Sequence, residues 1–148
     1  MSLANDRVLL RPCRSTDMAR QREHFKDPEL PWLDSYSPER YAAIDVDKLL
    51  DFEAARERHA VCLGIDVDRQ YIGLCQLMNT ADPNGVFELG INIGNRDYWN
   101  RGLGRSVTRL LLAHGFDDLG ANEIELTTNS RPTVSPRPNG WPLSCGRA

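Results

Sequence analysis

Long apolar runs are missing from this 148-residue chain. No stretch approaches the roughly 20 consecutive apolar residues that a membrane-spanning helix needs. The first residues also lack the charged, apolar and small-residue pattern of a secretory signal. These absences argue against a membrane partner and favour a cytoplasmic protein.

Paired cysteines and an excess of basic residues are also missing. The chain has four cysteines, none of them in a C-x-x-C pair: Cys13, Cys62, Cys75 and Cys145. They are too few for a disulfide framework, which suits a reducing compartment. With 18 Lys and Arg against 21 Asp and Glu, the net charge is −3, so general nucleic-acid binding is not expected. His24 and His59 have no partners at metal-ligand spacing, so no metal is expected.

What is present is the composition of one folded domain. Hydrophobic residues make up 41% and charged residues 26% of the chain, both within the globular range. The length suits one domain rather than two. Apolar periodicity and turn residues predict strands over residues 7–12, 59–68, 71–80, 86–94 and 123–128, and helices over 15–25, 37–58 and 103–119. The second helix is expected to break near Asp45.

The character of the sequence changes at Arg131. Segment 131–148 contains no Asp or Glu but four prolines: Pro132, Pro136, Pro138 and Pro142. Prolines at this spacing cannot sustain a helix and poorly suit a central strand. We therefore expect a domain over residues 1–130 and an irregular, proline-rich tail over residues 131–148.

The start of the long central helix is unusual. Helix starts favour Asp or Glu, because unpaired N–H groups give the first turn partial positive charge. Here the stretch "NRDYWNRGLGRS" (residues 95–106) leads into a helix with no carboxylate before Asp117. Instead it has arginines at positions 101, 105 and 109. The simplest explanation is that a ligand supplies the missing negative charge.

Three interpretations compete for Gly102-Leu103-Gly104. It could be only a flexible loop before a core helix. A dinucleotide fingerprint fails because Val107 stands at its third glycine, and no Gly-Lys-Ser/Thr of a P-loop follows. A glycine-rich, basic helix start does suit a diphosphate, whose oxygens can approach main-chain N–H groups closely where no Cβ intervenes.

The segment from Glu88 to Arg131 resembles the acyl-CoA-binding core of the GNAT superfamily of N-acyltransferases. The family motif is Gln/Arg-x-x-Gly-x-Gly/Ala, and Gly102 and Gly104 fit its last two positions. Trp99 occupies the first position, as aromatic residues often do in the branch that acetylates N-termini of ribosomal proteins, which this chain most resembles. The resemblance covers about residues 7–131 and implies an α+β fold with a mixed, mostly antiparallel sheet flanked by helices.

The resemblance implies transfer of an acetyl group from acetyl-CoA to a primary amine, by direct attack and without a metal. The acceptor would be a protein N-terminus or a small molecule. Main-chain N–H groups of residues 101–106 would hold the diphosphate of coenzyme A, and the backbone of residues 91–93 would pair with the pantetheine arm. One N–H of that strand would polarise the thioester carbonyl. The residues implied in cofactor binding are Ile91, Asn92, Ile93, Asn100, Arg101, Gly102, Leu103, Gly104, Arg105, Ser106 and Asn129.

Glu88 is the candidate catalytic base. An amine is mostly protonated at neutral pH and must lose a proton before it attacks a thioester. Glu88 lies on the polar face of the strand that leads to the cofactor site, where many relatives have a glutamate. The alternatives are that Glu88 only pairs with a surface cation, or that it acts through a water molecule.

Relatives continue after Asn-x-Arg with a helix and a strand hairpin, whereas here Pro132 follows Arg131. We expect the last helix and hairpin to be lacking, together with the tyrosine that commonly protonates the departing thiolate. A shifted reading frame or mis-joined end in the encoding DNA, or a naturally degenerate ending, would explain the change. The alternatives to an active enzyme are a catalytically weak or inactive acyl-CoA-binding protein and a phosphate-binding structural module. Without the hairpin, the strand over 123–128 would have an unpaired edge, which predicts marginal stability or a homodimer that covers this edge.

Overall fold

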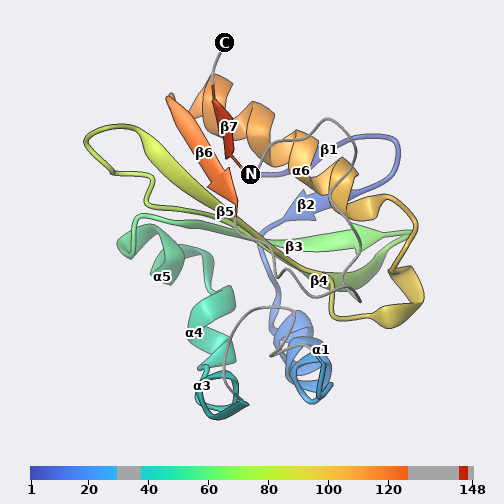
Figure 1. Cartoon of the computed structure of the whole chain (residues 1–148). Helices are drawn as coiled ribbons and strands as arrows, with labels where there is room; N and C mark the ends of the chain where they lie inside the picture. The colour runs from blue at the N-terminus through green and yellow to red at the C-terminus, as the bar shows by residue number, and fades with distance from the viewer. Residues whose placement is uncertain (30–37, 127–143, 147–148) are drawn as a thin grey trace.

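A computed structural model describes residues 1–29, 38–126 and 144–146 of the chain. Within these residues the strands form one seven-stranded sheet whose spatial order follows the sequence (Figure 1). The strands are β1 (Leu3–Ala4), β2 (Leu9–Arg11), β3 (Val61–Val67), β4 (Gln70–Met78), β5 (Val86–Asn92), β6 (Glu123–Leu126) and β7 (Ser144–Gly146). The helical segments are α1 (Ser15–Phe25), α3 (Pro38–Ala42), α4 (Val46–Leu50), α5 (Phe52–Glu57), the short η1 (Arg96–Tyr98), α6 (Leu103–Ala113) and the wider turn η2 (His114–Asp118).

Neighbouring strands run antiparallel except β5 and β6, which are parallel. A parallel pair needs a crossover connection, and α6 supplies it. The sheet carries α6 on one face and the group α1, α3, α4 and α5 on the other (Figure 1). The predicted α+β fold, with a mostly antiparallel sheet flanked by helices, is therefore confirmed.

Local turn chemistry explains the two hairpins before the crossover. Asp68 and Arg69 both have positive φ, at 49° and 66°, which is the backbone of a tight two-residue hairpin between β3 and β4. Between β4 and β5, the Asp82 carboxylate accepts hydrogen bonds from the main-chain N–H groups of Asn84 and Val86, at 3.0 and 3.1 Å. These bonds fix where β5 begins, and hence which of its residues face α6.

The apolar side of α6 packs on one face of the sheet. Leu103, Val107 and Leu111 recur every four residues and are at most 4% exposed, as an amphipathic helix requires. They share one apolar cluster with Phe87 and Leu89 of β5. The predicted alternation along this strand is confirmed, because Ile91 and Ile93 also pack against this cluster.

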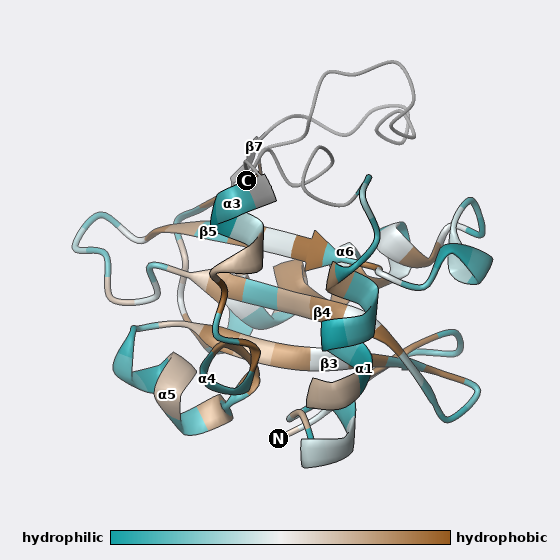
Figure 2. Ribbon diagram, turned by 90° about the horizontal axis from the view of Figure 1, so that it is seen from below, coloured by the Kyte–Doolittle hydropathy of each residue, from teal (hydrophilic) through white to brown (hydrophobic). Residues whose placement is uncertain are grey.

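The helices α4 and α5 on the opposite face are short because an aspartate caps the N-terminus of each and so begins a new helix. The Asp45 side chain accepts a hydrogen bond from the Lys48 N–H at 3.2 Å and caps α4. Asp51 accepts one from the Ala54 N–H at 2.7 Å and caps α5. The break expected near Asp45 is thus confirmed, and a second follows it. These helices cover the apolar middle strands β3 and β4, which Figure 2 shows in brown.

One expectation about the end of the chain is wrong. Residues 144–146 are not irregular, because they form β7 and pair antiparallel with residues 123–125 of β6. The three residues of β7 lie beyond the last proline, Pro142, so all of them can take part in a strand ladder. This part of β6 is therefore not an unpaired edge, and the argument for a homodimer that covers it no longer holds.

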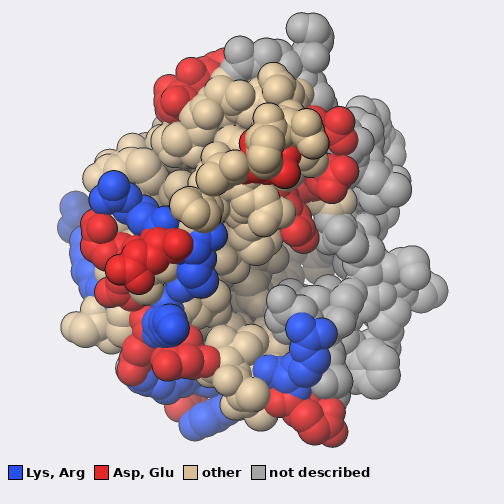
Figure 3. Space-filling view, turned by 90° about the vertical axis from the view of Figure 1, so that its left-hand side faces the viewer, with Lys and Arg blue, Asp and Glu red and all other residues tan. Residues whose placement is uncertain are grey.

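The surface of the described residues carries mixed charge. Acidic and basic side chains are interspersed on the face that includes α5 (Figure 3), where Glu53 pairs with Arg56 at 3.1 Å. Exposed pairs of this kind contribute little to stability. No helix in the part of the chain that the structure describes is both long and apolar enough to cross a bilayer.

Candidate functional site

The second half of β5 and the start of α6 form the centre of the candidate site. On one side, β5 pairs with β4 along residues 88–92. On the other side, its pairing with β6 runs from Val86 only to Leu89 among the described residues. Residues 90–92 thus have a strand neighbour on one side alone within that part of the chain. Residues 91 and 92 of this stretch belong to the segment 91–93, whose backbone was expected to pair with an extended ligand arm.

The start of α6 is built from left-handed backbone. Asn100 and Gly102 have φ of 60° and 73°, and Gly102 is the N-terminal cap residue of the helix. The first helical hydrogen bond runs from the Ser106 N–H to the Gly102 carbonyl at 3.3 Å. The N–H groups of Leu103 and Gly104 precede it and have no acceptor within the helix. Left-handed residues beside a helix start turn successive N–H groups towards one anion-sized concavity.

The start of α6 lacks the acidic residue that helix starts usually carry, as far as the described residues show. Among the described residues, no side chain caps the α6 N-terminus and no acidic residue occupies its first turn. At Gly104, a Cβ would meet no heavy atom within 4 Å, so the space beside this residue is open. The N-terminus of a helix carries partial positive charge and favours an anion. The geometry therefore agrees with the anion-binding interpretation of the glycine stretch.

Arginines surround the same helix start. Arg105 and Arg109 of α6 line a surface hollow of about 540 Å³, together with Gly102 and with Arg7 from the β1–β2 turn. Asp6 is the acidic residue of that lining. The Arg101 guanidinium lies over the Tyr98 ring, 5.0 Å from its centroid, an arrangement that holds its charge beside the loop.

The loop between β5 and α6 is held by Trp99 and Arg96. The Trp99 indole N–H donates a hydrogen bond to the Ile93 carbonyl at 2.6 Å. Arg96 lies over the Trp99 ring at 5.1 Å and pairs with Asp27, just beyond α1. This ion pair holds the pKa of the Asp27 carboxyl below its ordinary value. Trp99, which departs from the family motif, thus joins the strand to the helix start.

Glu88 lies on the sheet face opposite α6. Its neighbours Phe87 and Leu89 are buried beneath α6, and alternation along a strand puts Glu88 on the other face, half-buried. Glu125 of β6 is its partner in the parallel register, so both carboxylates belong to the same face. The structure therefore places two acidic residues beside each other near the open half of β5.

The same face holds Tyr41 of α3, which sequence analysis did not single out. The Asn92 side-chain amide donates to the Tyr41 hydroxyl at 3.1 Å, and Tyr41 is 4% exposed. The Phe25 ring meets the Tyr41 ring edge-on, with centroids 4.5 Å apart. A side chain from the helical layer thereby holds the last residue of β5.

His24 of α1 packs against the chain just after β5. A Cβ on Gly94 would lie 2.4 Å from the His24 Cβ, so only glycine allows this approach. The His24 ring stacks on Tyr71 at a centroid distance of 5.9 Å. Burial, with a smaller effect from the nearby Arg20 charge, lowers the pKa of His24. His24 is therefore a packed side chain next to the end of the strand, where burial favours its neutral form.

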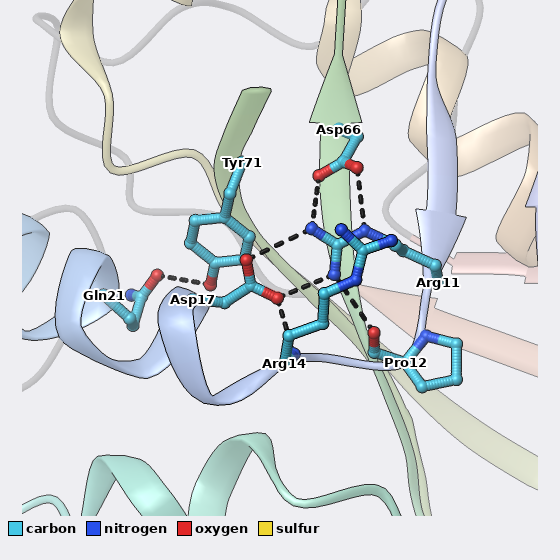
Figure 4. Close-up of polar contacts among 7 residues, drawn as sticks. All are labelled: Arg11, Pro12, Arg14, Asp17, Gln21, Asp66 and Tyr71. Atoms are coloured by element: carbon cyan, nitrogen blue, oxygen red, sulfur yellow. Dashed lines mark hydrogen bonds and ion pairs between the residues drawn. The ribbon is translucent and has the colours of Figure 1, made fainter. Parts of the chain in front are cut away.

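A buried network of ion pairs fixes α1, one of the helices on the sheet face opposite α6, to the sheet (Figure 4). Arg11 of β2 donates to both oxygens of Asp66, at 2.7 and 2.8 Å, and to both oxygens of Asp17, at 2.7 and 3.1 Å. The Asp17 carboxylate also accepts from the Arg14 N–H at 2.6 Å, at the start of α1. Beside it, the Tyr71 hydroxyl donates to Gln21 at 2.8 Å.

The strand β5 and the helix α6 after it were predicted from the sequence, but the residues that hold these two elements in place were not. Arg7, Tyr41 and Arg11 are each brought in from elsewhere in the fold, and no local spacing signals such contacts. Of the predicted residues, Asn129 lies outside the described part of the chain. No group of three or more His, Cys, Asp or Glu side chains placed to hold a metal occurs among the described residues.

The chain matches the family model of the acetyltransferase (GNAT) domain over residues 7–135. Similar solved structures include a GNAT-family acetyltransferase from Bacillus anthracis, with 17% identity and a TM-score of 0.66, covering 85% of this chain and 72% of that one. Spermidine N-acetyltransferase from Vibrio cholerae, in complex with CoA and spermine, has 17% identity and a TM-score of 0.65, covering 82% and 71%. An aminoglycoside acetyltransferase in complex with coenzyme A has 18% identity and a TM-score of 0.66, covering 82% and 74%.

A search of curated proteins gives no significant match. The structural matches, at these low identities, show likeness of fold, whereas the family model covers most of the chain. The second half of β5, which has no partner on its β6 side among the described residues, and the glycine-rich start of α6 lie within the matched residues. The chain therefore belongs to the GNAT acetyltransferase domain family.

Proposed function

We propose that this protein transfers an acetyl group from acetyl-CoA to a primary amine. The observation that carries the proposal concerns the described residues: among them, the start of α6 has no side-chain cap and no acidic residue in its first turn, and β5 has no partner beyond Leu89 on its β6 side. A thioester carrier with a diphosphate fits both features: the diphosphate needs an anion site, and the extended arm needs a strand edge. Two of the solved structures of similar fold are complexes with coenzyme A, which supports the choice of carrier.

The diphosphate would be held by the first turn of α6. The main-chain N–H groups of Leu103 and Gly104 point out of the helix start, whereas the Ser106 N–H already donates to Gly102. Of the main-chain N–H groups predicted to bind the diphosphate, over residues 101–106, we therefore exclude that of Ser106 and keep those before it. Arg101 and Arg105 add positive charge on either side.

Residues 91–93, at and just beyond the end of β5, would hold the arm of the carrier. A ligand amide pairing with this edge gains the hydrogen bonds that a further strand would make. A main-chain N–H at Ile91 or Ile93 would then donate to the thioester carbonyl and stabilise the negative charge that develops there. Trp99 supports this role because its bond to the Ile93 carbonyl fixes the end of the segment.

Glu88 would accept the proton that the amine loses. The amine nitrogen bonds to the acyl carbon, the carbon–sulfur bond breaks, and coenzyme A leaves as a thiolate. A placed base contributes about 10²–10⁴ in rate. Glu88 is half-buried on the face opposite α6, on the part of β5 just before the segment proposed to bind the arm.

The acceptor would be a cationic amine. Glu88 and Glu125 give this face two neighbouring carboxylates, which attract an ammonium group and disfavour an acidic substrate. Structures of similar fold include a spermidine and an aminoglycoside acetyltransferase. Peptide N-termini, the substrates of the ribosomal-protein branch, also carry a primary amine and belong in the same screen.

The test is an acceptor screen with acetyl-CoA, in which release of the free thiol is measured for spermidine, an aminoglycoside and peptides with free N-termini. Calorimetry with coenzyme A is run on the same protein. Turnover that depends on the amine, together with CoA binding, supports the proposal. CoA binding without turnover on any amine would make the protein an acyl-CoA-binding protein without transferase activity, and absence of CoA binding would overturn the site itself.

A further inference from the structure

Arg7 belongs to none of the elements predicted to form the site, yet its side chain reaches the start of α6. It lies in the turn between β1 and β2, 94 residues before Arg101 in sequence, and its Nη2 donates to the Arg101 carbonyl at 2.6 Å. A guanidinium is charged at all physiological pH values, so this is a charge-assisted hydrogen bond. It holds the peptide unit that joins Arg101 to Gly102.

The same guanidinium lies against Gly102. A Cβ on Gly102 would be 3.2 Å from Arg7 Nη1, closer than an ordinary van der Waals contact. Gly102 also has left-handed backbone, with φ of 73°. Arg7 therefore packs on the residue whose conformation turns the next two N–H groups out of the helix start.

Asn5 adds a second connection between the same turn and α6. Its side-chain amide donates to the Ser106 carbonyl at 3.3 Å. Its Oδ1 accepts from the main-chain N–H groups of Arg7 and Val8, at 2.9 and 3.0 Å. Such a turn, closed by an asparagine side chain, fixes the local backbone. The turn is thus tied to both ends of the first turn of α6, through Arg7 and through Asn5.

We propose that Arg7 is a positioning residue for the pyrophosphate of the acyl-CoA substrate, a role that rests on the function proposed above. By binding the Arg101 carbonyl, Arg7 keeps the Arg101–Gly102 peptide oriented so that the N–H groups of Leu103 and Gly104 face the ligand. Its charge adds to those of Arg105 and Arg109 in the same hollow. Loss of Arg7 should weaken binding of the carrier and leave the acetyl-transfer step unchanged.

The test compares coenzyme A binding by calorimetry in wild type, Arg7→Ala, Arg7→Lys and a control, Arg58→Ala. Arg58 makes the same kind of bond, from Nη1 to the Lys48 carbonyl at 3.3 Å, between α5 and α4. We expect Arg7→Ala to raise the Kd about tenfold, as loss of a charged hydrogen bond does. Arg7→Lys should lie between, because it keeps the charge but not the planar fork. Arg58→Ala should remain within about twofold of wild type.

A second ligand, 3′-dephospho-coenzyme A, separates positioning of the pyrophosphate site from contact with another phosphate. The proposal predicts the same loss in Arg7→Ala with both ligands. A loss confined to coenzyme A would make Arg7 a contact of the 3′-phosphate and overturn the proposal. Where an acceptor is turned over, Arg7→Ala should raise KM for acetyl-CoA with kcat unchanged.

Two further outcomes also decide the matter. If wild type binds coenzyme A and Arg7→Ala binds it equally well, the role of Arg7 is overturned and the proposed function stands. If wild type does not bind coenzyme A, the proposed function fails and the role of Arg7 falls with it. Should Arg7→Ala fail to fold, Arg7→Gln takes its place in the same comparison, because it keeps a donor and removes the charge.

Discussion

The indole of Trp99 and the carbonyl of Ile93 are joined by a 2.6 Å hydrogen bond that closes the loop between β5 and α6. The bond connects the strand segment proposed to hold the arm of the carrier with the helix start proposed to hold its pyrophosphate. Together with the Arg96–Asp27 pair, this bond helps to set the distance between the two halves of the site, and it comes from the position where the family motif has glutamine or arginine.

Replacing Trp99 by Phe removes this bond and keeps an aromatic ring. We expect coenzyme A affinity to fall about two- to thirteenfold, which corresponds to a neutral hydrogen bond of about 0.5–1.5 kcal/mol. Calorimetry measures the change. Tyr98→Phe is the matched control, because it removes the 3.0 Å bond from the Tyr98 hydroxyl to Gln70 and keeps the ring under Arg101. Equal affinities for the two variants would argue against a role for the Trp99 bond.

Replacing Glu88 by Gln keeps the shape of the side chain and removes the base. With any amine that the wild type acetylates, we expect kcat to fall by about 10²–10⁴ and coenzyme A affinity to remain unchanged. The control is Glu125→Gln, which alters the neighbouring carboxylate on β6 and should affect KM for a cationic amine more than kcat. A Glu88→Gln variant with wild-type kcat would leave Glu88 as a surface carboxylate.

Asp17 makes stability depend on pH. Burial acts to raise the pKa of Asp17, but the hydrogen bonds from Arg11 and the Arg14 N–H outweigh it and leave that pKa below its ordinary value of 3.8. A carboxyl whose pKa is lowered on folding stabilises the fold above its unfolded pKa, and this stabilisation is lost as pH falls through the folded pKa. The free energy of unfolding should therefore decrease below about pH 4.

The variant Asp17→Asn tests this account by urea denaturation at pH 7, 5 and 3. At pH 7 and 5 we expect it to be less stable than wild type by about 2–3 kcal/mol, because one partner of a buried ion pair is removed while Arg11 keeps Asp66. The difference should shrink at pH 3. Glu53→Gln, which removes an exposed pair with Arg56, should change stability by less than about 1 kcal/mol. A difference for Asp17→Asn that does not change with pH would contradict the account.

The parts of the fold that follow from local rules were predictable from the sequence. Alternation along β5, the positive-φ turn at Asp68 and the aspartate turn before β5 each depend on residues close in sequence. The order of the elements followed from them, whereas the α+β class was what the family resemblance implied. The extent of the second helix was less clear, because Asp51 can either continue a helix or cap the next one, and only packing decides.

The residues that brace the site could not be predicted in this way. Arg7 and Arg101 meet because the turn between β1 and β2 lies beside the start of α6, and Tyr41 meets Asn92 because α3 lies close to the end of β5. Such contacts depend on the tertiary arrangement, which spacing along the chain does not encode. The pairing of β7 with β6 was missed for a related reason: the prolines of the tail stop at Pro142, and strand pairing of so short a segment is decided by the available edge.

The most direct test of the account uses Gly104, whose side-chain position faces open space. A Cβ there would meet no heavy atom within 4 Å. Gly104→Ala and Gly104→Val should therefore fold, with a free energy of unfolding within about 1 kcal/mol of wild type. If the start of α6 holds the pyrophosphate, coenzyme A affinity measured by calorimetry should fall slightly in the Ala variant, which the family motif tolerates. In the Val variant, coenzyme A affinity should fall by about tenfold or more, because the branched side chain obstructs the approach of the pyrophosphate to the N–H groups. A folded Gly104→Val variant that binds coenzyme A as tightly as wild type would contradict the central claim.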